Sequence, residues 1–474
     1  MFRSGKYLYS LSPGLFFCSG FYKDIKEIRN KPQKFSYNEI MKHNNIQNGV
    51  WVTYKNKVYD VSNFLEIHPG GKENLLKAAG EDVEPYWKKY PQHYKVDVLN
   101  LLKDYEIGEI ENYKPIEIDI ETTEELKDIN YHNTTPQNGE MYTDKITASW
   151  ITPINDWYVR NHFEIPKVQH PDSYKIVVEL IDNDFILDYT KLLSMDSKEV
   201  ITTIQCGGNR RSDMNDYKKT MGTNWNIGAI STAKWEGVQL NKLLNLDDKY
   251  KDYHLEFESI DGVKVSIPVY KLKSCDDVIL AYKMNDELLP DIHGYPIRLI
   301  VPGYVGIRNL KWVSNIKLVK NECNSMWQTG LSYKPIPHYI NNINNDILNK
   351  VPTVLEQPVQ SCITNIQETP DNLVINGYAW SGGGRNIIRV DVSIDNGETW
   401  NMAELLEGSE QPLFQAWAWT LWKIELPKNE NKKYKVVCKS LDISYNTQPE
   451  DISSIWNIRG LVNNSWHSIN YSSS

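Results

Sequence analysis

Residues 200–214 read VITTIQCGGNRRSDM and join a β-branched run to a cysteine, two glycines and two arginines. The run at 200–205 predicts a buried strand that ends just before Cys206. The glycines that follow allow the backbone to turn or to approach a ligand closely. A soft thiolate beside the guanidinium groups of Arg210 and Arg211 suits a soft metal that faces an oxyanion. Taken alone, the stretch is explained more simply by a buried free cysteine that ends a strand.

Length and composition indicate a globular protein of several domains. The chain has 474 residues, of which 41% are hydrophobic and 24% charged, which suits two to four domains with their own cores. A formal net charge of −9 argues against nucleic acid as a partner and would attract a basic protein. The six cysteines are scattered without paired spacing, so we expect no disulfides.

The first 23 residues combine basic side chains and several serines with no acidic residue. This composition is typical of a mitochondrial presequence, and we expect residues 1–30 to form a targeting segment. The apolar piece at 15–21 is too short to span a bilayer. A frayed N-terminus without a targeting function is the alternative.

The motif NFLEIHPGG at 63–71 indicates a haem site. Proline fixes the backbone beside His68, and two glycines leave space for a bulky planar group. A second histidine, His93, follows on predicted short helices. Two neutral imidazoles can take both axial positions of a haem iron, which leaves no open position for oxygen and therefore implies electron transfer. We predict a small α+β haem-binding domain over residues 33–112.

Residues 113–140 lack helical or strand periodicity and accumulate acidic side chains, with Pro115, Pro136 and an Asn-Gly pair at 138–139 as interruptions. A charged segment with few apolar residues cannot offset its ordering entropy by burial. We therefore predict a flexible acidic linker that lets the haem domain move.

An arginine and a histidine lie close together in the sequence, near the start of the region 141–345. Arg160 and His162, in WYVRNHFEIP, are two positions apart, so an extended segment would project both to one side. There they could clasp a cofactor or an oxyanion, or they could form a surface pair.

A second basic region, DIHGYPIRLIVPGYVGIRNLKW at 291–312, places basic residues among glycine-rich turns. Exposed backbone N–H groups and basic side chains together suit a phosphate, although an ordinary basic loop would look the same. The motif lacks the residue order of a P-loop, so nucleotide hydrolysis is a poor interpretation. The basic residues are His293, Arg298, Arg308 and Lys311.

The last part of the chain, 346–474, follows a stretch crowded with proline and asparagine. Polar and apolar residues alternate at 389–394, Asp-Asn-Gly follows at 395–397, and 434–440 has the composition of another strand. Short strands separated by such turns predict an immunoglobulin-like β-sandwich.

The stretch at 200–214, together with GAISTAKWEG at 228–237 and GYAWSGGGR at 377–385, resembles the animal-type sulfite oxidases. The resemblance implies a multidomain α+β protein with three parts. These are a cytochrome b5-like haem domain, a mixed α+β molybdopterin domain over 141–345 and a dimerisation domain with an immunoglobulin-like fold. His68 and His93 match the family's haem ligands.

The resemblance also implies roles for individual side chains. Cys206 is expected to bind molybdenum through its sulfur, and Tyr333 to hydrogen-bond an oxo group or a substrate oxygen. Trp225 is expected to line the anion pocket, and Arg210 to make structural ion pairs. The arginines expected to contact the substrate are Arg160, Arg211 and Arg459. The residues expected to contact the molybdopterin are Tyr158, Val159, Arg160, Asn161, His162, Cys206, Asp261, His293, Arg298, Asn309, Leu310 and Lys311.

The implied activity is that of a molybdenum-dependent sulfite:cytochrome c (oxygen) oxidoreductase. Sulfite would be oxidised to sulfate at a molybdenum–molybdopterin centre, and electrons would pass through a b-type haem to cytochrome c in the mitochondrial intermembrane space. We expect a homodimer formed through the C-terminal domain, with no nucleic acid partner and no membrane span. The alternatives are a nitrate-reductase-like molybdoenzyme, whose haem and flavin modules would follow the molybdenum region, and an inactive cofactor-binding homologue.

Overall fold

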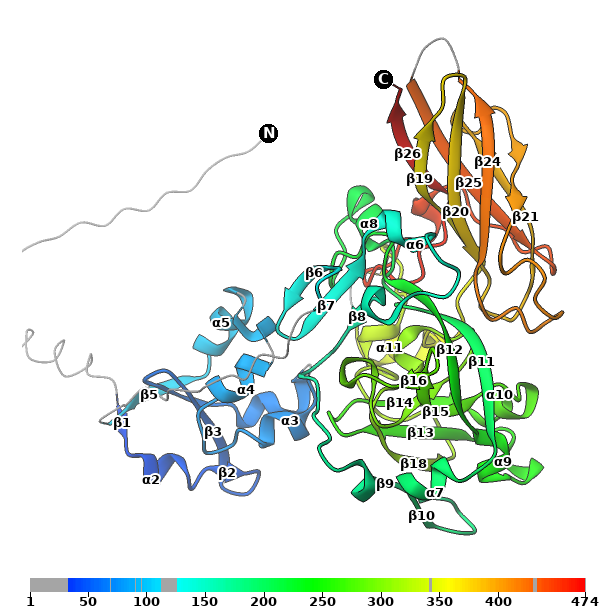
Figure 1. Cartoon of the computed structure of the whole chain (residues 1–474). Coiled ribbons are helices and arrows are strands. Elements are labelled where there is room, and N and C mark those ends of the chain that lie inside the picture. The colour runs from blue at the N-terminus through cyan, green and yellow to red at the C-terminus, as the bar shows by residue number, and fades with distance from the viewer. Residues whose placement is uncertain are drawn as a thin grey trace, which may run out of the picture. The chain divides into compact units, whose positions relative to one another are not determined.

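The structure is a computed structural model that describes residues 33–68, 70–89, 91–94, 96–111, 126–340, 343–428 and 433–473 (Figure 1). The chain divides into two compact units. The first consists of Met1–Trp87 with Gln92–Ile118, and the second of Lys88–Pro91 with Asp119–Ser474. The expected targeting segment at 1–30 lies outside the described residues.

The N-terminal unit is a small α+β domain built on one sheet, in the order β1-β5-β4-β3-β2. Alternate residues of β3 are buried, among them Val50 and Val52, and they pack with Leu65 and Trp87 from the helical segments. The strands are β1 (Lys34–Phe35), β2 (Asn44–Asn45), β3 (Gly49–Tyr54), β4 (Lys57–Asp60) and β5 (Glu106–Ile110). The helices are α2 (Tyr37–Ile40), η1 (Ser62–Ile67), α3 (Lys72–Leu76), α4 (Glu84–Lys89), η2 (Pro91–Tyr94) and α5 (Val96–Lys103).

The central part of the C-terminal unit contains two larger sheets, ordered β10-β9-β18-β13-β14 and β11-β12-β15-β16, with β17 paired to β15. The predicted strand at 200–205 lies within β11, which pairs with β12 along its whole length. The strands are β9 (Lys175–Glu179), β10 (Phe185–Asp188), β11 (Ser197–Gln205), β12 (Ile230–Gln239), β13 (His254–Ser259), β14 (Lys264–Pro268), β15 (Ile279–Met284), β16 (Glu287–Leu288), β17 (Arg298–Ile300) and β18 (Val313–Val319). The longer connecting helices are α7 (Tyr189–Leu193), α8 (Arg211–Tyr217), α9 (Leu240–Leu244) and α10 (Val269–Ser274).

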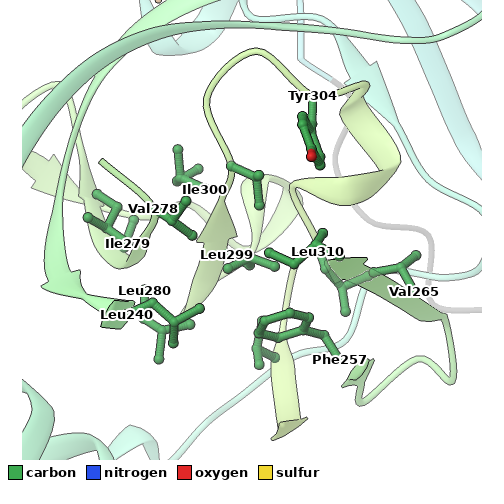
Figure 2. Close-up of a cluster of buried hydrophobic side chains, with 14 of the residues drawn as sticks. Leu240, Phe257, Val265, Val278, Ile279, Leu280, Leu299, Ile300, Tyr304 and Leu310 are labelled. Carbon is green, nitrogen blue, oxygen red and sulfur yellow. The ribbon is translucent and has the colours of Figure 1, made fainter. Parts of the chain in front are cut away.

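Buried apolar side chains fix the loop that carries part of the basic region (Figure 2). Leu299 and Ile300 at the start of this loop, and Leu310 at its end, belong to the same core as Phe257 and Val265. Burying a side chain of this size fully is worth about 1.5–3 kcal/mol. The polar residues between these anchors are therefore held on a rigid frame.

The prediction of a flexible linker over 113–140 is wrong for its last part. Residues 112–125 lie outside the described residues, but β6 (Ile129–Thr134) and β7 (Gln137–Met141) form a hairpin that β8 (Val159–Arg160) extends. Every residue of β7 is buried. Hydrogen bonds of Asn138 and Glu140 tie β7 to the rest of the unit, together with the apolar contacts of Met141. A prediction based only on the low apolar content of the segment overlooks these hydrogen bonds.

The C-terminal part of the chain is a β-sandwich, as the sequence predicts. One sheet has the order β19-β20-β24-β23 and the other β22-β21-β25-β26. In the predicted Asp-Asn-Gly turn, Asn396 and Gly397 take positive φ angles of 64° and 90°. The strands are β19 (Gln360–Glu368), β20 (Asn372–Trp380), β21 (Ile387–Ser393), β22 (Asn401–Met402), β23 (Glu404–Leu405), β24 (Thr420–Pro427), β25 (Lys433–Asp442) and β26 (His467–Ser472).

Two expectations about the whole chain can be compared with the described residues. The five cysteines in this part of the chain are all free and buried, which confirms the expected absence of disulfides there. Within the same residues, the structure contains no helix that is both long and apolar enough to cross a membrane.

Candidate functional site

Two histidine rings lie opposite one another in the N-terminal unit. The rings of His68 and His93 are nearly parallel, with centroids 6.1 Å apart and an interplanar angle of 19°. His68 Nδ1–H donates to the Gly71 carbonyl at 2.9 Å, which leaves Nε2 for a ligand. Burial lowers the pKa of His68, so its imidazole is neutral, as metal binding requires.

This pair of rings fits the axial ligands of one iron. Metal–imidazole bonds of about 2 Å on each side, added to the distance from each ring centre to its nitrogen, account for the separation of 6.1 Å. A Cβ atom on Gly70 would come within 2.8 Å of His68 Cε1, so this position beside the ring requires glycine. The carbonyl that orients His68 is the kind of partner that metal-binding histidines usually have.

In the C-terminal unit, Cys206 lies where β11 ends. Its backbone N–H donates to the Ala229 carbonyl at 3.0 Å, and the next residue, Gly207, accepts a bond from the Val462 N–H at 2.7 Å. The strand end is therefore tied both to the residue before β12 and to the far C-terminal segment. The Cys206 side chain is 7% exposed.

Cys206 lines a concave pocket, the kind of place in which proteins bind cofactors. All the residues that the family resemblance places at the molybdopterin line this pocket except Val159, which is buried in β8. The pocket is lined by Trp157, Tyr158, Arg160, Asn161, His162, Cys206, Asp261, Val263, His293, Arg298, Gly306, Ile307, Asn309, Leu310, Lys311, Trp312 and Tyr333.

The pocket wall carries more positive than negative charge. Arg160, Arg298 and Lys311 contribute cationic groups, whereas Asp261 is the acidic residue of the lining. Burial lowers the pKa of Arg298 to about 10. Burial, reinforced by Arg298, lowers the pKa of Lys311 well below its ordinary value. Crowded cations with one acid among them favour an anionic ligand.

Several polar atoms of this pocket are buried without a hydrogen-bond partner, namely His162 Nε2, His293 Nε2 and Arg298 Nε. Burial lowers the pKa of His162 and His293 well below the ordinary value, and nearby cations lower both further. Both imidazoles are therefore neutral and can each donate or accept one bond. Because each unsatisfied buried group costs about 1–3 kcal/mol, a ligand rich in polar and anionic atoms fits this set, as a phosphate-bearing pterin would.

The arginines expected at the substrate come from distant parts of the chain. Arg211 Nε donates to the Arg459 carbonyl at 2.9 Å, and its Nη1 donates to the Thr223 carbonyl at 2.6 Å. A Cβ atom on Gly208 would lie 2.3 Å from the Arg211 guanidinium, so glycine makes room for it. Burial lowers the pKa of Arg211 to about 10, with Cys206 opposing and Arg459 reinforcing the shift. Neither Arg211 nor Arg459 is among the residues that line the pocket.

Arg210, the neighbour of Arg211, has a different environment. It is 1% exposed, and its Nε pairs with Asp213 Oδ2 at 2.9 Å. Its two terminal nitrogens donate to the carbonyls of Ser465 and Trp466. Arg210 therefore has an acidic partner and joins the start of α8 to the C-terminal segment.

Two residues of β7 contact this region and were not recognised from the sequence. Asn138 Oδ1 accepts a bond from Arg160 Nη1 at 2.8 Å. Glu140 accepts bonds from the backbone N–H groups of Asn226 and Gly228, beside the fully buried Trp225. The Asn-Gly pair at 138–139 indicates a turn when it is considered alone, so the sequence carries no clear signal for this strand.

Arg308 also differs from expectation. Its sequence position within the basic region suited a phosphate, but it does not line the pocket. Its Nη2 donates to the Trp327 carbonyl and to Thr353 Oγ1, and its guanidinium lies 5.4 Å from the centre of the Tyr333 ring. Arg308 therefore supports the wall behind Tyr333.

Comparison with known proteins extends over nearly the whole chain. The rat protein "Sulfite oxidase, mitochondrial" (Rattus norvegicus) is 37% identical over 463 residues, which cover 92% of this chain and 84% of the rat protein. The chain belongs to the sulfite oxidase family. This confirms the resemblance predicted from the sequence.

Family models match three successive parts of this sulfite oxidase family member. They are a "Cytochrome b5-like Heme/Steroid binding domain" at 36–111, an "Oxidoreductase molybdopterin binding domain" at 162–327 and a "Mo-co oxidoreductase dimerisation domain" at 345–473. The predicted fold class, with a haem-binding domain, a molybdopterin-binding domain and a C-terminal β domain, is thereby confirmed.

Two further comparisons concern a nitrate reductase and a solved structure. A nitrate reductase from Brassica napus is 30% identical over 433 residues and matches 84% of this chain, but only 47% of that protein is covered. The solved structure of the sulfane dehydrogenase SoxCD from Paracoccus pantotrophus has a TM-score of 0.59 at 22% identity, over 71% of this chain and 87% of that chain. The SoxCD likeness shows a shared fold.

Proposed function

We propose that this chain oxidises sulfite to sulfate in the pocket beside Cys206 and passes the electrons through a haem held by His68 and His93. The observation that carries the proposal is the state of the arginines. Among the described residues, the ion pairs of arginine involve Arg210 and two residues of the C-terminal domain, but neither Arg160 nor Arg211. Their charges therefore remain available to a dianion.

The residues present would hold both cofactors. The Cys206 sulfur would bind molybdenum, and the polar groups of His162, His293, Arg298 and Lys311 would bind the pterin and its phosphate. When bound, molybdenum supplies a two-electron redox change and the haem iron transfers electrons singly.

The chain's own side chains bind and orient the substrate. Arg160, Arg211 and Arg459 would grip the oxyanion and present its sulfur in one direction, which provides positioning and charge stabilisation. Burial, together with Cys206, raises the pKa of the Tyr333 phenol. Tyr333 is therefore protonated at neutral pH and can donate a hydrogen bond to an oxygen atom of the substrate. The buried Trp225 indole would close this part of the site to water.

We further propose the acceptor, the assembly and the location. Cytochrome c is proposed as the acceptor because the net charge of −9 suits a basic partner protein. A homodimer through the C-terminal domain is supported by the matching dimerisation-domain model. The relatives named as mitochondrial support a mitochondrial location, and we propose the intermembrane space. Subfractionation of mitochondria with marker proteins for each compartment tests the location.

One assay tests the proposed reaction. Purified protein loaded with molybdopterin and haem is given sulfite, with either ferricytochrome c or ferricyanide as the acceptor. We expect sulfite-dependent reduction of both, and sulfate as the product. If neither acceptor is reduced, the proposed activity is refuted; if only ferricyanide is reduced, cytochrome c is refuted as the acceptor. Reduction of nitrate by the dye-reduced protein, without sulfite oxidation, would favour the nitrate-reductase-like alternative.

A further inference from the structure

Asn138 in β7 holds the side chain of Arg160 from behind. Its Oδ1 accepts bonds from Arg160 Nη1 at 2.8 Å and from the Asn161 backbone N–H at 3.0 Å. Its Nδ2 donates to the Pro136 carbonyl at 2.8 Å. Asn138 is 2% exposed, so these bonds are made away from water and fix the amide in one orientation.

The other hydrogen-bond partners of Arg160 are also uncharged. Its Nη1 donates to the Asn161 carbonyl, and its Nη2 lies 3.0 Å from His162 Nδ1. Burial and Arg160 itself lower the pKa of His162 well below the ordinary value, so this imidazole is neutral. Arg160 is therefore held by an amide, a carbonyl and a neutral ring.

Arg210 has a different set of partners from Arg160. Arg210 is buried, whereas Arg160 is half-buried, and a carboxylate, Asp213, lies 2.9 Å from Arg210 Nε. An isosteric aspartate at position 138 would accept the same two bonds as Asn138. It would also place a negative charge beside Arg160, and that charge would compete with any anion in the pocket.

We propose that Asn138 is a positioning residue of the anion site, which fixes Arg160 with a neutral acceptor and so preserves its charge for the substrate. The choice of amide over carboxylate thereby sets the affinity for divalent oxyanions. This inference rests on the proposed function, because it takes sulfite and its product sulfate as the anions that Arg160 meets.

Two substitutions separate charge from geometry. Asn138→Asp retains the acceptor oxygen and adds a charge, whereas Asn138→Ala removes the acceptor and adds no charge. If the proposal is right, Asn138→Asp raises the KM for sulfite and the dissociation constant for sulfate by about ten- to a hundredfold, the range expected for a charged hydrogen bond. Asn138→Ala should raise both by less, about three- to tenfold.

Sulfate binding to the cofactor-loaded protein, measured by titration calorimetry and by the sulfate-induced rise in melting temperature, gives a readout independent of turnover. Asn183→Asp serves as the control, because it makes the same chemical change at an exposed residue between β9 and β10 and should leave both constants unchanged. Asn138→Asp also loses the hydrogen bond to the Pro136 carbonyl. The melting temperature without sulfate is therefore measured for each variant, which separates a loss of stability from a loss of sulfate binding.

The outcomes are distinguishable from those for the proposed function. Wild-type protein that does not oxidise sulfite refutes the function itself. If wild-type protein is active but Asn138→Asp binds sulfate as tightly as wild type, or more tightly than Asn138→Ala, the inference about charge is overturned. Should Asn138→Asp fail to fold, Asn138→Ala carries the test alone, because unchanged affinity for sulfate and sulfite in that variant would show that Asn138 does not position Arg160.

Discussion

The proposed haem site and the proposed molybdenum pocket are built from very different lengths of chain. His68 directly follows η1 and His93 lies in η2, so both come from the segment between β4 and β5, and their rings face each other within one small unit. The pocket and its arginines combine Arg160 from β8, Cys206 from the end of β11 and Arg459 from the segment before β26. The histidine pair can therefore form once one short segment has folded, whereas the pocket forms only when the whole C-terminal unit has folded.

The difference also explains which features are visible in a sequence. Proline and glycine beside a histidine give a local motif whose geometry follows from the backbone alone. The pocket has local motifs as well, at 157–162 and 291–312, but these become neighbours of each other and of Cys206 only after the sheets have formed. The most direct ways to test this contrast are substitutions that remove one site and leave the other intact.

The largest effect is expected for Cys206→Ser. Replacing a soft thiolate by a hard hydroxyl should remove turnover with every acceptor. Because changes to partners of metal ligands already cost about 10–100-fold, we expect a loss of sulfite oxidation greater than about a hundredfold. Molybdenum and pterin content should persist, since the basic residues of the pocket remain. Cys275→Ser, at another buried cysteine, is the control. Near-normal turnover by Cys206→Ser would rule out this cysteine as the metal ligand.

Removing a haem ligand should separate the two regions. His93→Ala or His68→Ala should abolish the bis-histidine haem spectrum, because each removes one of the two proposed haem ligands. The rate of cytochrome c reduction should then fall to background. Sulfite oxidation with ferricyanide should remain within about twofold, since the pocket lies in the other unit. His43→Ala, in the same unit but stacked on Trp51, should retain both activities. Loss of ferricyanide reduction in a folded, molybdenum-loaded His93→Ala protein would contradict the independence of the two sites.

The sequence predicted most of the elements that frame these sites, and its failures have a common physical cause. The strand before Cys206 was predicted correctly, because β-branched residues indicate a buried strand directly. The hairpin with Asn138 and Glu140 was missed, since its burial depends on polar hydrogen bonds with residues far along the chain. Arg308, one of the basic residues of the region 291–312, lies outside the pocket, because its carbonyl and hydroxyl partners, at Trp327 and Thr353, come from elsewhere in the chain.

A smaller effect is expected at Arg459, which lies outside the pocket lining and whose carbonyl accepts a hydrogen bond from Arg211. Arg459→Met retains the length of the side chain but removes its charge, and Arg459 Nε has no protein partner to lose. The KM for sulfite should rise by about ten- to a hundredfold, because a charged hydrogen bond is worth about 1.5–3 kcal/mol. Arg389→Met removes an arginine paired with Asp391 on the C-terminal domain and should leave the KM unchanged. If Arg459→Met also leaves it unchanged, Arg459 does not contact the substrate.

The smallest effect concerns the connection between the pocket and the β-sandwich. His467, in β26, accepts a hydrogen bond from the Ile363 N–H through Nδ1 at 3.0 Å. Burial, reinforced by Arg210, lowers the pKa of His467 to about 3. Arg210 in turn bonds the Ser465 carbonyl and lies four residues from Cys206 along the chain. Protonation of His467 would therefore weaken the contact that joins the sandwich to the metal-binding segment.

The sign of this pH effect follows from the direction of the pKa shift. Because the folded-state pKa lies below the unfolded value, the unfolded chain binds more protons between about pH 6.5 and about pH 3. The free energy of unfolding should therefore fall as the pH is lowered through this window. His467→Gln keeps a hydrogen-bond acceptor but does not titrate. The free energy of unfolding of this variant should therefore fall less steeply than that of the wild type as the pH is lowered. Denaturant unfolding of the C-terminal unit at several pH values measures both slopes. Equal slopes would mean that His467 does not couple acid pH to this contact, and the pocket would then depend less on the sandwich than its hydrogen bonds indicate.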